Sequence, residues 1–131
     1  MSGIRPTLIM KQAKCSCKGD NLDKLIQPIL LTLLSKQELH GYRIIQEMEN
    51  KNYFPGEKID NTGVYRTLKG MEERVLVRSR WDLEGSGPAK KIYCITEEGR
   101  ICLRNWVGTL RTYMDTIGRI IEEAQTVLGQ Q

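Results

Sequence analysis

The last quarter of the chain holds the feature that most restricts its fold. Apolar residues recur every three or four positions from Leu103 to Val127, and a second apolar row repeats every seven positions beside them. This spacing predicts one long helix with a coiled-coil-like stripe. At ~1.5 Å per residue, residues 97–128 would span roughly 48 Å, whereas a small domain is only ~30 Å across. The sequence therefore predicts that much of the stripe packs against a second copy of the chain.

The expected dimerisation surface is made of the apolar residues on this stripe: Leu103, Trp106, Val107, Leu110, Tyr113, Met114, Ile117, Ile120 and Ile121. The alternative is a helix that folds back against its own core. Trp106, Leu110 and Tyr113 are also the candidates for an effector groove in the dimer, although aromatic residues at helical spacing more often form an apolar interface.

The composition excludes several classes of protein. The chain has 131 residues, a net charge of +4, one histidine and four cysteines. A single histidine argues against a Ser-His-Asp triad or a histidine-rich metal site, and no paired acid–base set or phosphate loop occurs, so neither an enzyme nor a cofactor is expected. There are too few cysteines for a disulfide scaffold, no apolar run long enough for a membrane span and no signal peptide. We therefore expect a cytoplasmic protein without membrane contact.

The positive charge is unevenly distributed. Residues 1–96 contain 16 basic and 11 acidic side chains, whereas residues 97–131 contain 4 basic and 5 acidic ones. The basic excess gathers in the first residues and in the segment 74–91. A basic patch of this kind is compatible with binding to nucleic acid, but it can also be an ordinary solvated surface.

Three shorter helices are expected before the long one. The first starts at Leu22, and Pro28 either kinks it or begins its main part. The second begins near Gly41, and the third follows a cap at Asp60 or Asn61. Two strands, 76–82 and 90–95, then flank a Gly-rich turn, which is typical of a hairpin with a longer loop.

This order of elements predicts a mainly α fold with a small β-hairpin: a winged helix-turn-helix followed by a long C-terminal dimerisation helix. We divide the chain into a partly disordered N-terminal arm (1–20), a DNA-binding domain (21–96) and the dimerisation helix (97–131).

The third helix has two distinct faces when it is projected at about 100° per residue. Its apolar face holds Val64, Leu68, Met71 and Val75. The opposite face holds several hydrogen-bond donors and no acidic group, because Glu72 and Glu73 lie towards the C-terminal end. An α-helix fits the ~12 Å major groove of DNA, so this polar face is expected to contact double-stranded DNA. The residues predicted to bind DNA are Asn61, Thr62, Tyr65, Arg66, Lys69, the hairpin residues Lys90 and Lys91, and Tyr42.

Several segments occur in an order typical of one family: ILLTLL at 29–34, LHGY at 39–42, GVYRTLKGMEE at 63–73, GSGPAKKIY at 85–93 and ITEEGR at 95–100. Because these segments occur in this order, the chain resembles the PadR-type transcriptional regulators over about residues 22–125. The resemblance implies a dimeric repressor in which Tyr65 and its neighbours contact DNA, the hairpin is the wing, and a small molecule releases the operator.

One departure from the family pattern lies after the third helix. Arg74-Val75 stands where such proteins usually have a Glu/Lys-Gly turn. Because a residue that tolerates left-handed backbone is missing there, we expect the helix end to be built differently.

Three other functions compete with the repressor. Cys15 and Cys17 are spaced so that two thiolates could bind a soft metal or act as a redox pair, although no nearby ligands complete a zinc site. The same fold could instead serve as a protein-interaction module that uses the long helix for docking. In a third alternative, the groove for a small-molecule effector is the main functional site.

Overall fold

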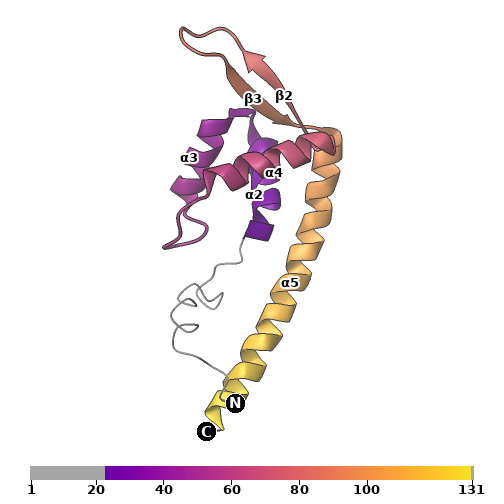
Figure 1. Cartoon of the computed structure of the whole chain (residues 1–131). Helices are drawn as coiled ribbons and strands as arrows, with labels where there is room; N and C mark the ends of the chain where they lie inside the picture. The colour runs from indigo at the N-terminus through magenta and orange to yellow at the C-terminus, as the bar shows by residue number, and fades with distance from the viewer. Residues whose placement is uncertain (1–22, 131) are drawn as a thin grey trace, which may run out of the picture.

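The computed structural model describes residues 23–130, in which helices pack together with a small antiparallel sheet at one end, and one helix extends far beyond them (Figure 1). The elements follow in the order η3 (Asp23–Leu25), α2 (Ile26–Lys36), β1 (Leu39–His40), α3 (Gly41–Lys51), α4 (Asn61–Glu73), β2 (Val77–Asp82), β3 (Lys90–Ile95) and α5 (Glu97–Gly129). The predicted fold class, mainly helical with a hairpin and a long last helix, is confirmed. Cys15, Cys17 and the N-terminal arm lie outside the described residues.

Two details of the N-terminal half differ from the sequence prediction. Within the described residues, the predicted first helix consists of a 3-10 turn over Asp23–Leu25 and an α-helix from Ile26. Pro28 is therefore the third residue of α2, within the first turn, where proline costs no intrahelical hydrogen bond. The segment between α2 and α3 also contains the short strand β1, which the sequence did not predict.

The sheet has three strands in the order β1-β3-β2, all antiparallel. In β1, Leu39 pairs with Tyr93 and His40 with Ile92, while β2 pairs with β3 along its whole length. The outer ends of β2 and β3 thus extend past β1 as a two-stranded hairpin. We call this hairpin, residues 77–95, the wing; it projects from the top of the molecule in Figure 1.

The core lies where α2, α3, α4 and the base of the sheet meet. Its fully buried side chains come from each of these elements: Leu30, Leu31, Ile44, Met48, Val64, Leu68, Met71 and Val77. Each helix contributes residues at a spacing of three or four, which is the reason that its opposite face remains in solvent. The apolar face of α4 is therefore held against the core, and the polar face of α4 is exposed to solvent.

Val75 does not lie on the apolar face of α4, contrary to the projection. The helix ends at Glu73, and Val75 follows it with φ 61° and a 46% exposed side chain. The N–H of Leu76 donates to the Met71 carbonyl at 2.9 Å, and the N–H of Val75 donates to the Glu72 carbonyl at 3.0 Å. This is the Schellman arrangement that normally uses glycine. The prediction of a differently built helix end was wrong: valine takes the glycine position.

Replacing Val75 by glycine should stabilise the protein by about 1 kcal/mol. A β-branched residue in the left-handed region is strained by ~1–3 kcal/mol, and glycine removes that strain at some cost in unfolded-state entropy. The exposed valine side chain contributes little apolar burial in return. Urea unfolding measures the effect, with Val75→Ala as the control, because alanine retains a Cβ and should gain little. A lower midpoint for Val75→Gly would contradict this account.

Thr96 and Gly99 join the sheet to α5. The Thr96 hydroxyl donates to the Val75 carbonyl at 2.6 Å and accepts from the Gly99 N–H at 2.9 Å, so Thr96 is the N-cap of α5. A Cβ on Gly99 would lie 2.2 Å from the Leu76 carbonyl oxygen. Gly99 therefore permits a backbone approach that no other residue allows.

The two halves of α5 have different environments. Cys102, Leu103 and Trp106 pack against the core, mainly on α2, whereas the C-terminal half runs away from the other described elements (Figure 1). No helix among residues 23–130 combines the length and hydropathy needed to cross a membrane.

Candidate nucleic-acid interface

The polar face of α4 is exposed along its whole length. Asn61, Thr62, Tyr65, Arg66 and Lys69 all lie on the surface, and we call these five residues the α4 face. None of the five makes a hydrogen bond or ion pair through its side chain to another described residue. Their donors are therefore available to a ligand, as a helix in the major groove requires.

Tyr65 lies directly over the start of α3. A Cβ on Gly41 would be 2.6 Å from the Tyr65 ring and 2.9 Å from its hydroxyl. The glycine thus creates the space for the tyrosine, and the phenol stands beside the first backbone N–H groups of α3. Tyr42 adds a second exposed ring here, with the Lys90 ammonium 5.1 Å from its centre. Two hydroxyls, a lysine and a helix N-terminus together form a surface suited to a phosphate.

The wing places Lys91 opposite α4. The Lys91 ammonium is 3.8 Å from a carboxylate oxygen of Glu72, 5.8 Å from the centre of the Trp81 ring and 5.9 Å from that of Tyr93. The Ser79 hydroxyl also donates to Glu72. These contacts connect the wing to α4 through the Glu72 carboxylate.

Glu72 corrects the prediction that the polar face of α4 carries no acidic group. Tyr65, Lys69, Glu72, Glu73 and Lys91 line one shallow concavity with Tyr93. Glu72 lies seven residues after Tyr65, which is two helical turns, so the same projection could have identified it. Burial, with the nearby Glu72 carboxylate and Tyr65, raises the pKa of Tyr93 and keeps its hydroxyl protonated.

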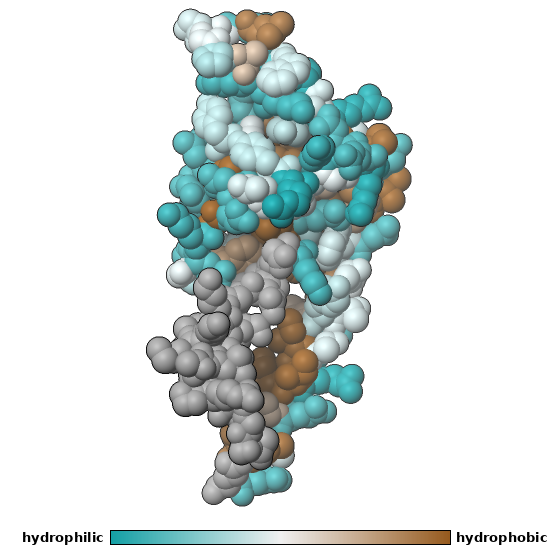
Figure 2. Space-filling model, in the orientation of Figure 1, coloured by the Kyte–Doolittle hydropathy of each residue, from teal (hydrophilic) through white to brown (hydrophobic). Residues whose placement is uncertain are grey.

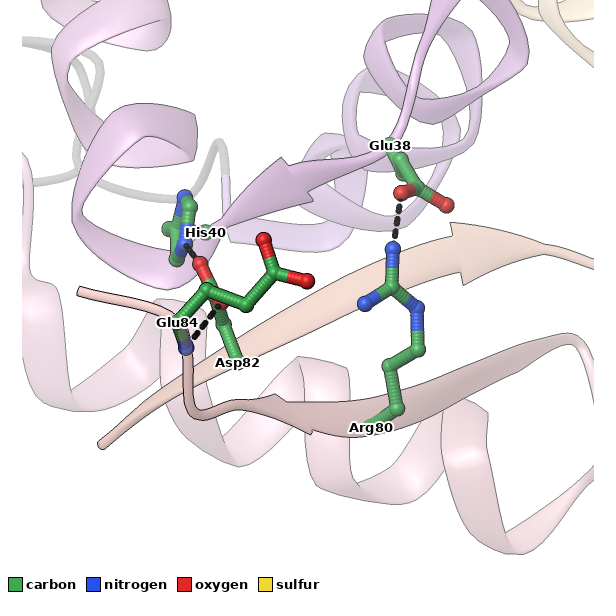
Figure 3. A network of polar contacts seen from close by, with 5 residues as sticks. All are labelled: Glu38, His40, Arg80, Asp82 and Glu84. Carbon is green, nitrogen blue, oxygen red and sulfur yellow. Dashed lines mark hydrogen bonds and ion pairs between the residues drawn. The ribbon is translucent and has the colours of Figure 1, made fainter.

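A polar network on the other face of the wing fixes its direction (Figure 3). His40 on β1 reaches Asp82 on β2 at 3.0 Å, and Glu38 pairs with Arg80, so both contacts pass over the central strand β3. The backbone N–H of Glu84, followed by the His40 ring, lowers the pKa of Asp82, which keeps this carboxylate ionised. Sequence reasoning missed this network because its partners are 42 residues apart.

The residues of the predicted dimerisation surface fall into two groups. Leu103, Trp106 and Leu110 are partly buried; Leu103 and Trp106 pack against the core of their own domain, and the Trp106 indole donates to Gln27 at 2.8 Å. The alternative, a helix packed on the core of its own chain, therefore describes the N-terminal part of α5 as far as Trp106. The other group is exposed and is called the distal stripe: Val107, Tyr113, Met114, Ile117, Ile120 and Ile121.

The predicted effector groove belongs to a dimer, and in the single chain its three residues lie in different surroundings. Leu110 lines an apolar hollow of ≈ 390 Å³ with residues of α2 and with Tyr53 and Phe54, but Trp106 and Tyr113 are not part of it. Trp106 is instead held by Gln27.

Within residues 23–130, no three His, Cys, Asp or Glu side chains are grouped closely enough to hold a metal ion. Cys94 and Cys102 are free thiols and only partly buried.

The three-helix core, the antiparallel wing and an exposed, donor-rich second helix of the helix-turn-helix define a winged-helix protein. A family model described as "Transcriptional regulator PadR-like family" matches residues 30–105. The chain therefore belongs to the PadR-like family of transcriptional regulators, whose members are not enzymes.

Individual relatives agree with this assignment. A Mycobacterium tuberculosis protein named "Probable transcriptional regulator Rv1176c" is 32% identical over 80 residues, which is 60% of this chain and 41% of that protein. The chain thus matches less than half the length of this relative. The structure of the protein TA0346 from Thermoplasma acidophilum has a TM-score of 0.67 at 27% identity, covering 77% of this chain and 94% of that one. Bacillus subtilis PadR in complex with operator DNA has a TM-score of 0.57 at 25% identity, covering 63% of this chain and 45% of that one.

Proposed function

We propose that this regulator is a dimeric repressor that binds a palindromic operator through the α4 face and the wing, and that a small molecule releases it. The single observation that carries the proposal is the exposed α4 face beside Lys90 and Lys91, in which the side chains of Arg66 and Lys69 have no partner among residues 23–130. The related Bacillus subtilis PadR has been crystallised with operator DNA, which supports the same class of ligand here.

The distal stripe supports a dimer. Six large apolar side chains on one helix are exposed in the protomer, and contiguous exposed apolar surface of this kind is typical of an interface. A two-fold dimer would present two α4 helices, so the operator should be a palindrome. In this proposal residues 21–96 bind DNA and residues 97–131 dimerise, with the first turns of α5 also completing the core.

The apolar hollow beside Leu110 supports release by a small molecule. It is bounded by α2, by α5 and by Tyr53 and Phe54 of the segment that leads into α4. An apolar effector bound there would contact both the dimerisation helix and the segment that precedes the recognition helix. Such a ligand could shift the separation of the two α4 helices only if it bound one arrangement better than the other.

Selection of bound sequences from random duplex DNA tests the proposal. We expect a palindrome whose half-sites lie about one helical turn, or a multiple of it, apart. Binding should weaken steeply with salt, since phosphate contacts release counterions. Recovery of no enriched sequence at low salt would remove the DNA-binding assignment and favour the protein-interaction alternative.

Single substitutions on the α4 face should then separate base contacts from phosphate contacts. Arg66→Ala is expected to weaken binding to the selected duplex by about 10- to 100-fold, as loss of a bidentate base contact does. Lys69→Ala should instead lower the slope of log affinity against log salt by about 1. Arg111→Ala on α5 is the control, because it removes the same charge on a different element. Unchanged affinity in both α4 variants, measured by gel shift, would refute the role of this face.

A further inference from the structure

A small cavity lies between the end of α3 and the segment that leads into α4. Its volume is ≈ 190 Å³, and its lining includes Met48 and Ile59, which lie in or against the core. An engineered apolar cavity of ~150 Å³ binds benzene, so this one has room for a ligand with a single ring. The cavity differs from the hollow beside Leu110, with which it shares only Tyr53 and Phe54.

A tight turn brings two of the lining residues together. The Glu57 N–H donates to the Phe54 carbonyl at 3.0 Å. Pro55 and Gly56 lie between them, and Gly56 has φ 83°, which is the pattern of a type II turn. The segment that joins α3 to α4 lies on the side of the domain away from the wing (Figure 1). On the side of the molecule where α3 lies, Figure 2 shows hydrophobic patches between hydrophilic side chains.

The charges at the cavity favour a cation. Glu49 and Glu57 both line it, and Lys58 is the one basic residue of the described chain that does so. Within residues 23–130, neither of the two carboxylates lies within ion-pair distance of a basic side chain, Lys58 included. The side chains around the cavity therefore carry a net negative charge.

The position of Glu49 favours the same sign of ligand. Glu49 lies in the last turn of α3, which ends at Lys51. The C-terminus of a helix carries a partial negative charge, so a carboxylate there is unfavourable unless a cation neutralises it. Lys51 belongs to the same turn but forms no ion pair with Glu49. A cation in the cavity would interact favourably with both the carboxylate and the helix end.

Two aromatic rings line the same cavity. The ring centres of Tyr53 and Phe54 are 6.4 Å apart, and their planes are inclined at 48°. The face of an aromatic ring attracts a cation, and quaternary ammonium groups are recognised in this way. Met48 and Ile59 supply apolar surface for the rest of such a ligand.

We infer that this cavity binds a small organic cation that carries one aromatic ring. The ammonium group lies between the two carboxylates and the aromatic side chains, and the ring of the ligand lies against Met48 and Ile59. Because residues 52–60 lead directly into α4, the ligand contacts the segment that precedes the recognition helix. The site includes no residue of the α4 face or of the wing, so it goes beyond the proposed function and does not depend on it.

Calorimetric titration of the full chain with benzyltrimethylammonium tests the inference, and benzenesulfonate serves as a single-ring ligand of opposite charge. The cation should bind at least about tenfold more tightly than the sulfonate. Glu49→Gln with Glu57→Gln should weaken binding of the cation about tenfold, because two partly solvated charge pairs are lost. Both residues are exposed, so this variant should fold. Tyr53→Leu should weaken binding about threefold or more through loss of the ring face.

Two control variants separate this site from its alternatives. Glu122→Gln with Glu123→Gln removes two exposed carboxylates from α5, and Leu110→Ala alters only the other hollow. Both variants should bind benzyltrimethylammonium as the wild type does.

Three results would overturn the inference: no binding of the cation, equal affinity for the two ligands, or unchanged affinity in the Glu49/Glu57 variant. Loss of binding in Leu110→Ala alone would also overturn it, because the ligand would then occupy the hollow beside Leu110. None of these measurements involves DNA, so the proposed function is tested separately.

Discussion

Replacing Gly99 by alanine should destabilise the protein by about 3 kcal/mol, the opposite of the usual effect of this change in a helix. Alanine normally gains up to ~1 kcal/mol over glycine inside a helix. Here the new Cβ would lie 2.2 Å from the Leu76 carbonyl oxygen and 2.7 Å from the Ile95 side chain. The first turn of α5 cannot move aside without breaking the Thr96 cap, whose hydroxyl also bonds the Val75 carbonyl. Overpacking of such a junction costs ~1–3 kcal/mol or more.

The matched control is Gly70→Ala, also within a helix. A Cβ on Gly70 meets nothing within 4 Å, so this variant should keep or slightly gain stability. Urea unfolding of both variants at one protein concentration measures the difference, since the midpoint of an oligomer depends on concentration. A Gly99→Ala midpoint equal to that of the wild type would show that the junction can relax.

The double substitution Ile117→Glu with Ile121→Glu should convert the protein to a monomer and lower operator affinity at least about 100-fold. The two side chains are 55% and 50% exposed in the protomer, so the protomer should still fold. In a dimer the carboxylates would be buried in an apolar interface without partners, which is strongly unfavourable. A monomer then binds one half-site and loses the gain of two linked contacts, which is commonly 10²-fold or more.

A control on the opposite face of α5 separates dimerisation from simple charge repulsion. Thr112→Glu with Thr126→Glu adds the same negative charge at exposed positions away from the distal stripe. This variant should remain dimeric and bind the selected duplex almost as the wild type does. Light scattering after gel filtration gives the mass, and gel shift gives the affinity. A dimeric mass for the Ile117/Ile121 variant would exclude the distal stripe as the interface.

The recognition helix shows how far sequence alone could go. In α4, the buried residues Val64, Leu68 and Met71 and the exposed face follow from a period of 3.6 residues, which is a local property. Glu72 obeys the same period, yet its effect on the site was missed because the wing supplies its partners. Val75 was misplaced because the projection continued the helix past its actual end.

In α5, the sequence likewise predicted the local pattern but not the packing partners. Its length and stripe were evident from the heptads, but Trp106 and Leu103 face the core of their own chain. The indole of Trp106 is fixed by Gln27, which is 79 residues away in the sequence. A pattern on one helix shows which residues are apolar, but it does not distinguish an intramolecular partner from a second copy.

The sequence by itself determined the order of helices and strands, the two faces of α4 and the excess length of α5, because periodicity, caps and turn residues act over a few neighbouring positions. Only the tertiary structure decided the third strand, the left-handed Val75, the bracing of the wing by His40 and Asp82, and the contact of Lys91 with Glu72. These features depend on contacts between segments far apart in the chain, and such contacts form only when the core has brought the segments together.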